Sequence, residues 1–249
     1  VDEKSWTEFM PNGVTKAFFR DFIKYYDPEV FIAAGRKIRA EAYNADSLPP
    51  LERVRKITAL FSCFKNPDKE TVLTPWRVVN MHMSDCLGGY DFFDEAHNEH
   101  IEAPRFVDHG DVTADTFGNP NAAVLEINSK TGLYPLYVTY SIFRAKCSAY
   151  SEDELDVELQ EKLWDETVRD NVFVVCKTPM AKSITKRTLV GYRDAEVNAH
   201  YFDDLINMLK NKPGNFTKKV LKRSYWNQNG GGNMKFDAVV GNPPYQLTD

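Results

Sequence analysis

The chain has 249 residues, of which 43% are hydrophobic and 13% aromatic, enough to bury the core of one large domain or of two smaller ones. Its formal net charge of −5 does not predict nucleic-acid binding by the chain as a whole. No apolar run approaches the roughly 20 residues that cross a bilayer, and the four cysteines form no C-x-x-C pair, which is typical of reduced thiols. We therefore expect a cytoplasmic protein with no membrane partner.

Apolar residues recur at helical spacing through the first third of the chain. This spacing predicts three helices, over residues 14–26, 29–43 and 51–64. We expect residues 1–70 to form a helical N-terminal subdomain. Thr74-Pro75 then predicts an N-cap, followed by proline in the first turn of a helix that ends at Gly88-Gly89. Residues 91–121 are polar and turn-rich and show no strong period.

Strands alternate with helices from residue 122 onward. Short apolar runs predict strands over residues 122–127, 171–176 and 197–202, and a fourth that ends at Gly241. The predicted helices between them cover residues 133–147, 152–169, 179–192 and 205–223. This alternation indicates βαβ units and a doubly wound α/β domain over residues 71–249. Ligands of such sheets bind at the carboxyl ends of the strands, where the turn after residue 127, Asp203 and Asn242 are expected.

Three further features of the sequence have competing interpretations. Basic residues cluster in Lys177–Arg193 and again in Lys210–Arg223, and a solvated helix face explains such runs more often than DNA binding does. Asp94-Glu95-Ala96-His97 spells a helicase box, but the sequence has no phosphate-binding G-x-x-x-x-G-K-[ST] loop. His97 and His100 with neighbouring acids could suggest a metal site. An acidic loop that faces solvent is the favoured interpretation, and no metal is expected.

The tetrapeptide Asn242-Pro243-Pro244-Tyr245 follows the last predicted strand. Each proline fixes its own φ and restricts the residue before it, so the loop is rigid before a ligand arrives. It would present a side-chain carbonyl and a backbone carbonyl as fixed acceptors beside an aromatic ring. That arrangement suits a planar base with an exocyclic amino group. An ordinary turn is the alternative, because Asn-Pro and Pro-Pro are common in turns.

With its flanks, this stretch resembles a known catalytic motif. FDAVVGNPPY is similar to the (D/N/S)-P-P-(Y/F) motif of N6-adenine-specific DNA methyltransferases, where it follows an apolar strand. Four other segments resemble the cofactor regions of that family: VLTPWRVVNMHM, VLEINSKTG, NVFVVCKTPMA and HYFDDL. The resemblance implies that S-adenosylmethionine is bound by Thr74, Pro75, Glu126, Asn128, Thr131, Gly132 and Asp203. It also implies that Asn242, Pro243, Pro244 and Tyr245 are catalytic.

Two residues depart from the family pattern. Lys130 stands where the cofactor loop has its first glycine, and Cys176 stands where an acidic residue usually binds the ribose. A thiol cannot accept two hydroxyl hydrogen bonds as a carboxylate can. If the ribose acid is absent, Cys176→Asp is expected to tighten cofactor binding.

The resemblance implies methyl transfer from S-adenosylmethionine to N6 of an adenine flipped out of double-stranded DNA. It places the chain in a restriction–modification enzyme, with other domains or subunits of that system as partners. The alternative is a degenerate, methyltransferase-like module that binds DNA or a partner subunit without catalysis.

The resemblance implies a partial Rossmann-like sheet of four strands in the order 3-2-1-4, preceded by the helical subdomain. The chain stops soon after the NPPY motif. We therefore expect little activity from these 249 residues alone, and either self-association or a disordered C-terminus.

Overall fold

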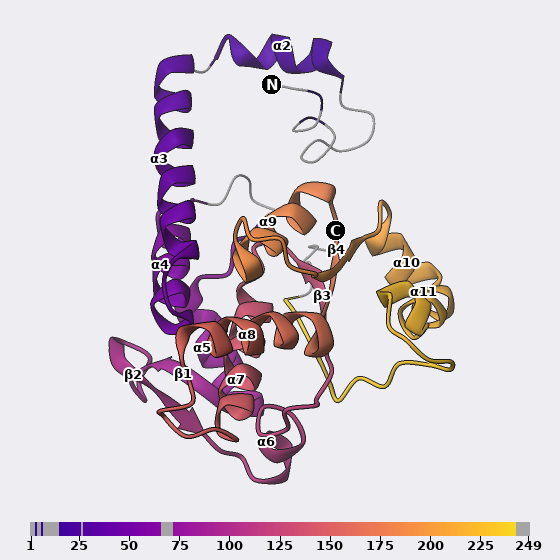
Figure 1. Cartoon of the computed structure of the whole chain (residues 1–249). Helices are drawn as coiled ribbons and strands as arrows, with labels where there is room; N and C mark the ends of the chain where they lie inside the picture. Colours follow the sequence, from indigo (N-terminus) through magenta and orange to yellow (C-terminus); the bar gives the residue numbers. More distant parts are fainter. Residues whose placement is uncertain (1–2, 4–5, 7–14, 26, 66–71, 243–249) are drawn as a thin grey trace.

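The computed structural model describes residues 3, 6, 15–25, 27–65 and 72–242. Its N-terminal helices are α2 (Lys16–Ile23), α3 (Pro28–Asp46) and α4 (Pro50–Ser62), followed by α5 (Trp76–Leu87). The long α3 extends away from the body of the molecule and α2 lies across its far end (Figure 1). The predicted helices in this part of the chain are confirmed, with ends shifted by a few residues. No described helix combines the length and the apolar character needed to cross a membrane.

Capping and packing differ between α3 and α4. The Asp27 carboxylate accepts from the backbone N–H groups of Glu29 and Val30, so α3 has a capped start. Ala45 is the only buried residue of α3. Helix α4 instead places Val54 and Ile57 in the main core, against α5, α7 and α8. This helix therefore packs directly on the part of the chain that follows residue 70.

A β-hairpin follows α5, where no strand is expected from the sequence. Strands β1 (Gly89–Phe93) and β2 (His100–Val107) pair in antiparallel fashion, and the short α6 (Asp111–Asp115) follows. Four of the five β1 residues are buried, whereas β2 is mostly exposed or half-buried. The residues of β1 do not alternate between polar and apolar, and those of β2 do so only over 100–103, so the period-two signal was weak.

The central sheet has four parallel strands, β3 (Val124–Ser129), β4 (Val172–Cys176), β5 (Asn198–Tyr201) and β6 (Ala238–Val240). Their spatial order is β5-β4-β3-β6. This is the expected order 3-2-1-4, so the predicted α/β architecture is confirmed at the level of strand order and direction. The helices are α7 (Leu133–Cys147), α8 (Val157–Asn171), α9 (Pro179–Val190), α10 (Leu205–Asn211) and α11 (Pro213–Val220), with a 3₁₀ turn at Arg223–Trp226.

Two sequence predictions about these helices need correction. The helix expected to start at residue 152 starts at Val157, because the Asp156 carboxylate caps it by accepting from the Leu159 N–H. The helix expected over 205–223 is divided at Lys212, because Pro213 has no N–H to continue the first helix and instead begins the next one.

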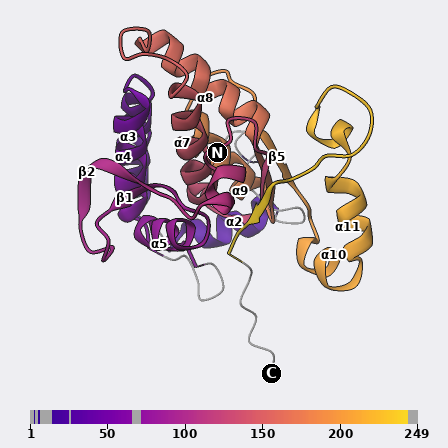
Figure 2. The same cartoon turned by 90° about the horizontal axis from the view of Figure 1, so that it is seen from below.

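Each face of the sheet has its own core. Val124, Val174 and Cys176 belong to the larger core, together with α7, α8 and α9, whereas Leu125 and Phe173 belong to the smaller one. Seen from below, α10 and α11 lie on the opposite side of the sheet strands from α7, α8 and α9 (Figure 2). The alternation of side chains along β3 thus distributes its residues between two layers of helices.

Candidate cofactor and catalytic site

Asn242 follows β6 at the carboxyl edge of the sheet, and two of the predicted site residues contact it. Its Nδ2 donates a hydrogen bond to Thr74 Oγ1 at 2.8 Å. Its backbone carbonyl accepts from Asn128 Nδ2 at 3.2 Å. Thr74, Asn128 and Asn242 come from three segments that are far apart in the sequence. The fold therefore joins the start of α5, the end of β3 and the end of β6 at one point.

The role expected for Thr74 at the start of α5 was wrong. Pro75, with φ −62° and ψ 150°, occupies the N-cap position, and no side chain caps the helix there. The helix starts at Trp76. The Thr74 hydroxyl therefore lies just outside the helix and is available as the acceptor for Asn242.

A cavity of about 570 Å³ lies beside Thr74. Its wall includes three of the expected cofactor residues, Thr74, Pro75 and Thr131. The first two precede α5, and Thr131 precedes α7. Helix α4 and the hairpin supply further wall residues, among them Phe61, Phe93 and His100, which the sequence analysis did not assign to a site. The wall thus combines hydroxyl groups with aromatic surface, as sites for amphipathic small molecules do.

Glu126, in the middle of β3, is a buried carboxyl group without a full set of partners. Its side chain is 4% exposed, and its Oε2 has no hydrogen-bond partner among the described residues. Burial raises the pKa of Glu126 to about 8, and a hydrogen bond with Ser129 opposes this shift only in part. A carboxyl group in this state is a candidate to receive a ligand's donor or positive charge.

The loop from β3 to α7 turns tightly. Asn128 and Gly132 have φ values of 70° and 79°, in the left-handed region. A Cβ on Gly132 would lie 3.0 Å from Cα of Thr185 in α9, so glycine is required both by the backbone angle and by this close approach. The Thr131 carbonyl accepts from the Thr188 hydroxyl at 2.6 Å, which fixes the loop on α9.

The two departures from the family pattern have clear structural places. Lys130 Nζ donates to the Val72 carbonyl at 3.2 Å, so the residue that replaces a glycine links the β3–α7 loop to the segment before α5. Cys176 is fully buried at the end of β4, with its Sγ 3.9 Å from Thr185 Oγ1. Its side chain belongs to the core below α9 and cannot present a group to a ribose.

The remaining predicted site residues are not part of this cluster. Asp203 lies in the exposed turn after β5, at the same edge of the sheet. Pro243, Pro244 and Tyr245 lie outside the described residues, as does the end of the chain for which disorder was expected.

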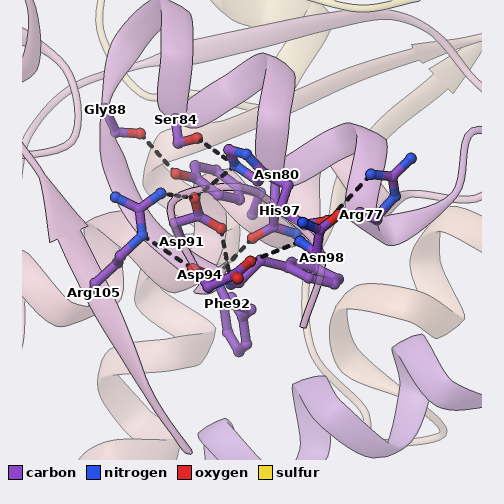
Figure 3. A network of polar contacts seen from close by, with 12 residues as sticks. Arg77, Asn80, Ser84, Gly88, Asp91, Phe92, Asp94, His97, Asn98 and Arg105 are labelled. Carbon is purple, nitrogen blue, oxygen red and sulfur yellow. Dashed lines mark hydrogen bonds and ion pairs between the residues drawn. The ribbon is translucent and has the colours of Figure 1, made fainter. Parts of the chain in front are cut away.

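A polar network lies under the hairpin (Figure 3). The buried Asp91 carboxylate contacts His97 Nε2 at 2.8 Å and an Arg105 guanidinium nitrogen at 2.7 Å. Ser84 Oγ lies 3.2 Å from the same His97 Nε2. His97 is 6% exposed, so the expectation of a solvent-facing loop was wrong for this residue. Its imidazole instead points inward, where it contacts the buried Asp91 carboxylate.

This network does not have the geometry of a catalytic triad. A Ser-His-Asp triad uses both nitrogens of the imidazole, one for the serine and one for the aspartate. Here Ser84 and Asp91 both contact Nε2. In the part of the chain that the structure describes, no group of three or more His, Cys, Asp or Glu side chains could hold a metal ion. The network therefore serves to attach the hairpin to α5.

Comparison with known proteins gives a match in the C-terminal third of the chain. Residues 170–249 match the family model described as Eco57I restriction-modification methylase. The matched part includes β4, β5, β6 and Asn242. No curated protein and no solved structure matches the chain. The match supports a methylase of a restriction–modification system.

Proposed function

We propose that the chain carries the cofactor and catalytic regions of a DNA methyltransferase that transfers a methyl group from S-adenosylmethionine to N6 of adenine. The contact of Asn242 with both Thr74 and Asn128 is the observation that carries the proposal. It brings together three segments that each resemble a motif of this family. The match of residues 170–249 to a restriction-modification methylase supports the same activity.

Asn242 would act as the acceptor for the amino group of the target base. Because its Nδ2 donates to Thr74, its Oδ1 is left to accept a hydrogen bond from N6–H₂. The carbonyl of Pro243 would be the second acceptor and Tyr245 would stack on the flipped adenine, while Pro244 would keep the loop rigid. Catalysis of this kind rests on positioning and on fixed dipoles.

The residues around the cavity fit S-adenosylmethionine, which supplies an electrophilic methyl group when bound. Thr74, Pro75 and Thr131 would hold it from the cavity wall. Glu126 has an unpaired buried oxygen that a positively charged or hydroxyl-bearing ligand could satisfy. Asn128 and Gly132 shape the loop, and Asp203 would contact the adenine of the cofactor. Double-stranded DNA and other domains of the restriction–modification system would be the partners.

Calorimetric titration with S-adenosylmethionine tests the cofactor assignment. The unaltered chain should bind, and Thr74→Val should weaken binding about tenfold, because one hydrogen-bond acceptor at the site is lost. Thr217→Val, at an exposed position of α11, is the matched control and should bind as the unaltered chain does. Absence of binding by the unaltered chain would contradict the assignment.

The base is tested separately by analysis of the methylated nucleoside. Duplex DNA is incubated with labelled cofactor and the protein, both as this chain and extended past residue 249, and is then digested to nucleosides. Label in N6-methyladenine supports the proposal, and label confined to a methylated cytosine would refute the adenine assignment. Asn242→Ala should abolish the label.

A non-catalytic module is the second candidate, and the burial of Cys176 favours it. The end of β4 offers no acid for the ribose, and Lys130 replaces a loop glycine. Binding of DNA without measurable binding of S-adenosylmethionine would support this second candidate.

A further inference from the structure

The segment from residue 205 to residue 236 has an unusual charge. It contains seven Lys and Arg residues and no Asp or Glu, whereas the whole chain has a net charge of −5. The rest of the protein is correspondingly acidic. We call residues 205–236 the basic segment. Its positive charge is therefore a local property and not a reflection of overall composition.

The fold directs these charges outward. Leu205, Phe216, Val220 and Trp226 of the basic segment pack into the smaller core against β3 and β4. Lys212, Lys218, Lys219 and Lys222 are exposed on the other side. Helices α10 and α11 lie beside the sheet (Figure 2) and pack on it through their apolar residues, which leaves these ammonium groups exposed to solvent.

The lysines on this face are not neutralised by the protein. No carboxylate among the described residues lies within salt-bridge distance of Lys212, Lys218, Lys219 or Lys222. Lys219 lies over the rings of Phe202 and Tyr225, with its Nζ 4.7 and 5.3 Å from their centroids. A solvated helix face needs no such concentration of like charge, because like charges on one face repel.

The basic face is also hollowed. A depression of about 450 Å³ is lined by Asn215, Lys218, Lys219, Lys222, Ser224 and Tyr225. Three ammonium groups stand beside amide and hydroxyl groups, which are the side chains that contact the phosphates and sugars of nucleic acids. The segment exposes no large hydrophobic side chain among its described residues, so it lacks the apolar anchor of a membrane-binding helix.

We propose that this face of α11 binds the phosphate backbone of duplex DNA. The choice of duplex DNA rests on the proposed function. Helix α10 begins directly after the turn that contains Asp203, at the carboxyl edge of the sheet where Asn242 lies. Helix α11 follows α10 directly, so DNA bound by α11 would be held by the same layer of helices that begins at the edge where Asn242 lies. The contacts are with phosphates and carry no sequence information.

Salt-dependent DNA binding tests this surface. Fluorescence anisotropy of a labelled 30-base-pair duplex is measured at 50 to 200 mM salt for the unaltered chain and for the triple variant Lys218→Gln, Lys219→Gln, Lys222→Gln. The variant should bind on the order of tenfold or more weakly. The slope of log K against log salt should be smaller in magnitude by about 2.7, because three phosphate contacts are lost.

Two further variants distinguish loss of this surface from loss of total charge and from loss of folding. Lys24→Gln, Lys37→Gln, Lys162→Gln removes the same charge from exposed positions elsewhere and should leave the slope unchanged. Replacement of Lys218, Lys219 and Lys222 by Arg should keep both affinity and slope, because the positive charges remain. Circular dichroism should be the same for all variants.

The outcomes distinguish failure of this proposed DNA-binding surface from failure of the proposed methyltransferase function. Three results would each overturn the proposal that this surface binds duplex DNA. They are equal binding by the unaltered chain and the Gln variant, absence of duplex binding by the unaltered chain, and preference for vesicles of anionic lipid over the duplex. Binding of S-adenosylmethionine is measured in parallel. Its absence from a chain whose DNA binding still depends on the three lysines would refute the methyltransferase function and leave the surface standing.

Discussion

The hairpin β1–β2 and strand β3 each bury one carboxyl group, and the two groups have different partners. Asp91 in the hairpin contacts Arg105 and His97 and also accepts from the Phe93 N–H. Glu126 in β3 has an oxygen without a described partner, and burial raises its pKa to about 8. The negative charge of Asp91 is balanced by neighbouring side chains, whereas Glu126 has no cationic partner among the described residues.

This difference separates a structural polar group from a candidate ligand-binding one. A buried charge with cationic partners at hydrogen-bonding distance fixes two elements relative to each other. A buried carboxyl group without such partners reduces stability unless it is protonated or receives a ligand. Glu126 also stands in the segment that resembles a cofactor loop, whereas Asp91 does not. The partners of each group, and not its burial alone, therefore indicate its role.

The largest effect on stability is expected when a second acidic residue is placed near Glu126. Cys176→Asp would place another carboxyl group in the core near Glu126, where burial and the charge of Glu126 outweigh the opposing effect of Lys182. The free energy of unfolding should fall by about 4 kcal/mol at pH 8. Urea unfolding measures this change, and Cys176→Ala, which adds no charge, should cost clearly less. Stability equal to that of the unaltered chain together with tighter cofactor binding would restore the interpretation of this position as a ribose site.

Removal of the compensated carboxylate should have the next largest effect. Asp91→Asn leaves Arg105 and His97 without their negative partner, and the free energy of unfolding should fall by about 3 kcal/mol. Asp85→Asn, at an exposed position of α5, is the control and should change stability by less than about 0.5 kcal/mol. If both variants unfold at the same urea concentration, the network does not hold the hairpin.

The uncompensated carboxyl group predicts the smallest of the three effects, and its sign depends on pH. The pKa of Glu126 is about 8 in the folded protein and near the ordinary value of 4.5 for a glutamate when unfolded. The folded state therefore binds the proton more tightly, and stability is lost as pH rises from about 4.5 through 8. The difference between these two pKa values corresponds to at most about 5 kcal/mol. Relaxation and water penetration around the ionised group reduce this cost, so Glu126→Gln should be more stable than the unaltered chain at pH 9 by about 2 kcal/mol. Thermal unfolding at pH 5 and pH 9 measures the difference, and parallel pH profiles would show that Glu126 does not titrate in this range.

The sequence alone was sufficient to predict the helices of the N-terminal region and the four parallel strands, whereas the order of the strands was expected from the resemblance to a known family. These elements carry strong local signals. Helical spacing in residues 51–64 and the apolar run from Val172 to Cys176 each follow from burial of one face or of a whole strand. The motif at Asn242 was also visible, because prolines restrict the backbone whatever surrounds them.

Tertiary structure decided the properties that depend on residues distant in the sequence. Thr74 became a partner of Asn242 only because β6 lies beside β3, and Cys176 became a core residue only because α9 covers it. The hairpin could not be predicted from periodicity, since one of its strands is almost wholly buried and the other has no buried residue. Local sequence determines which elements form, through backbone preferences and the spacing of apolar residues. The partners of a buried polar group are determined by the packing of those elements, and the chemistry of the site follows from that packing.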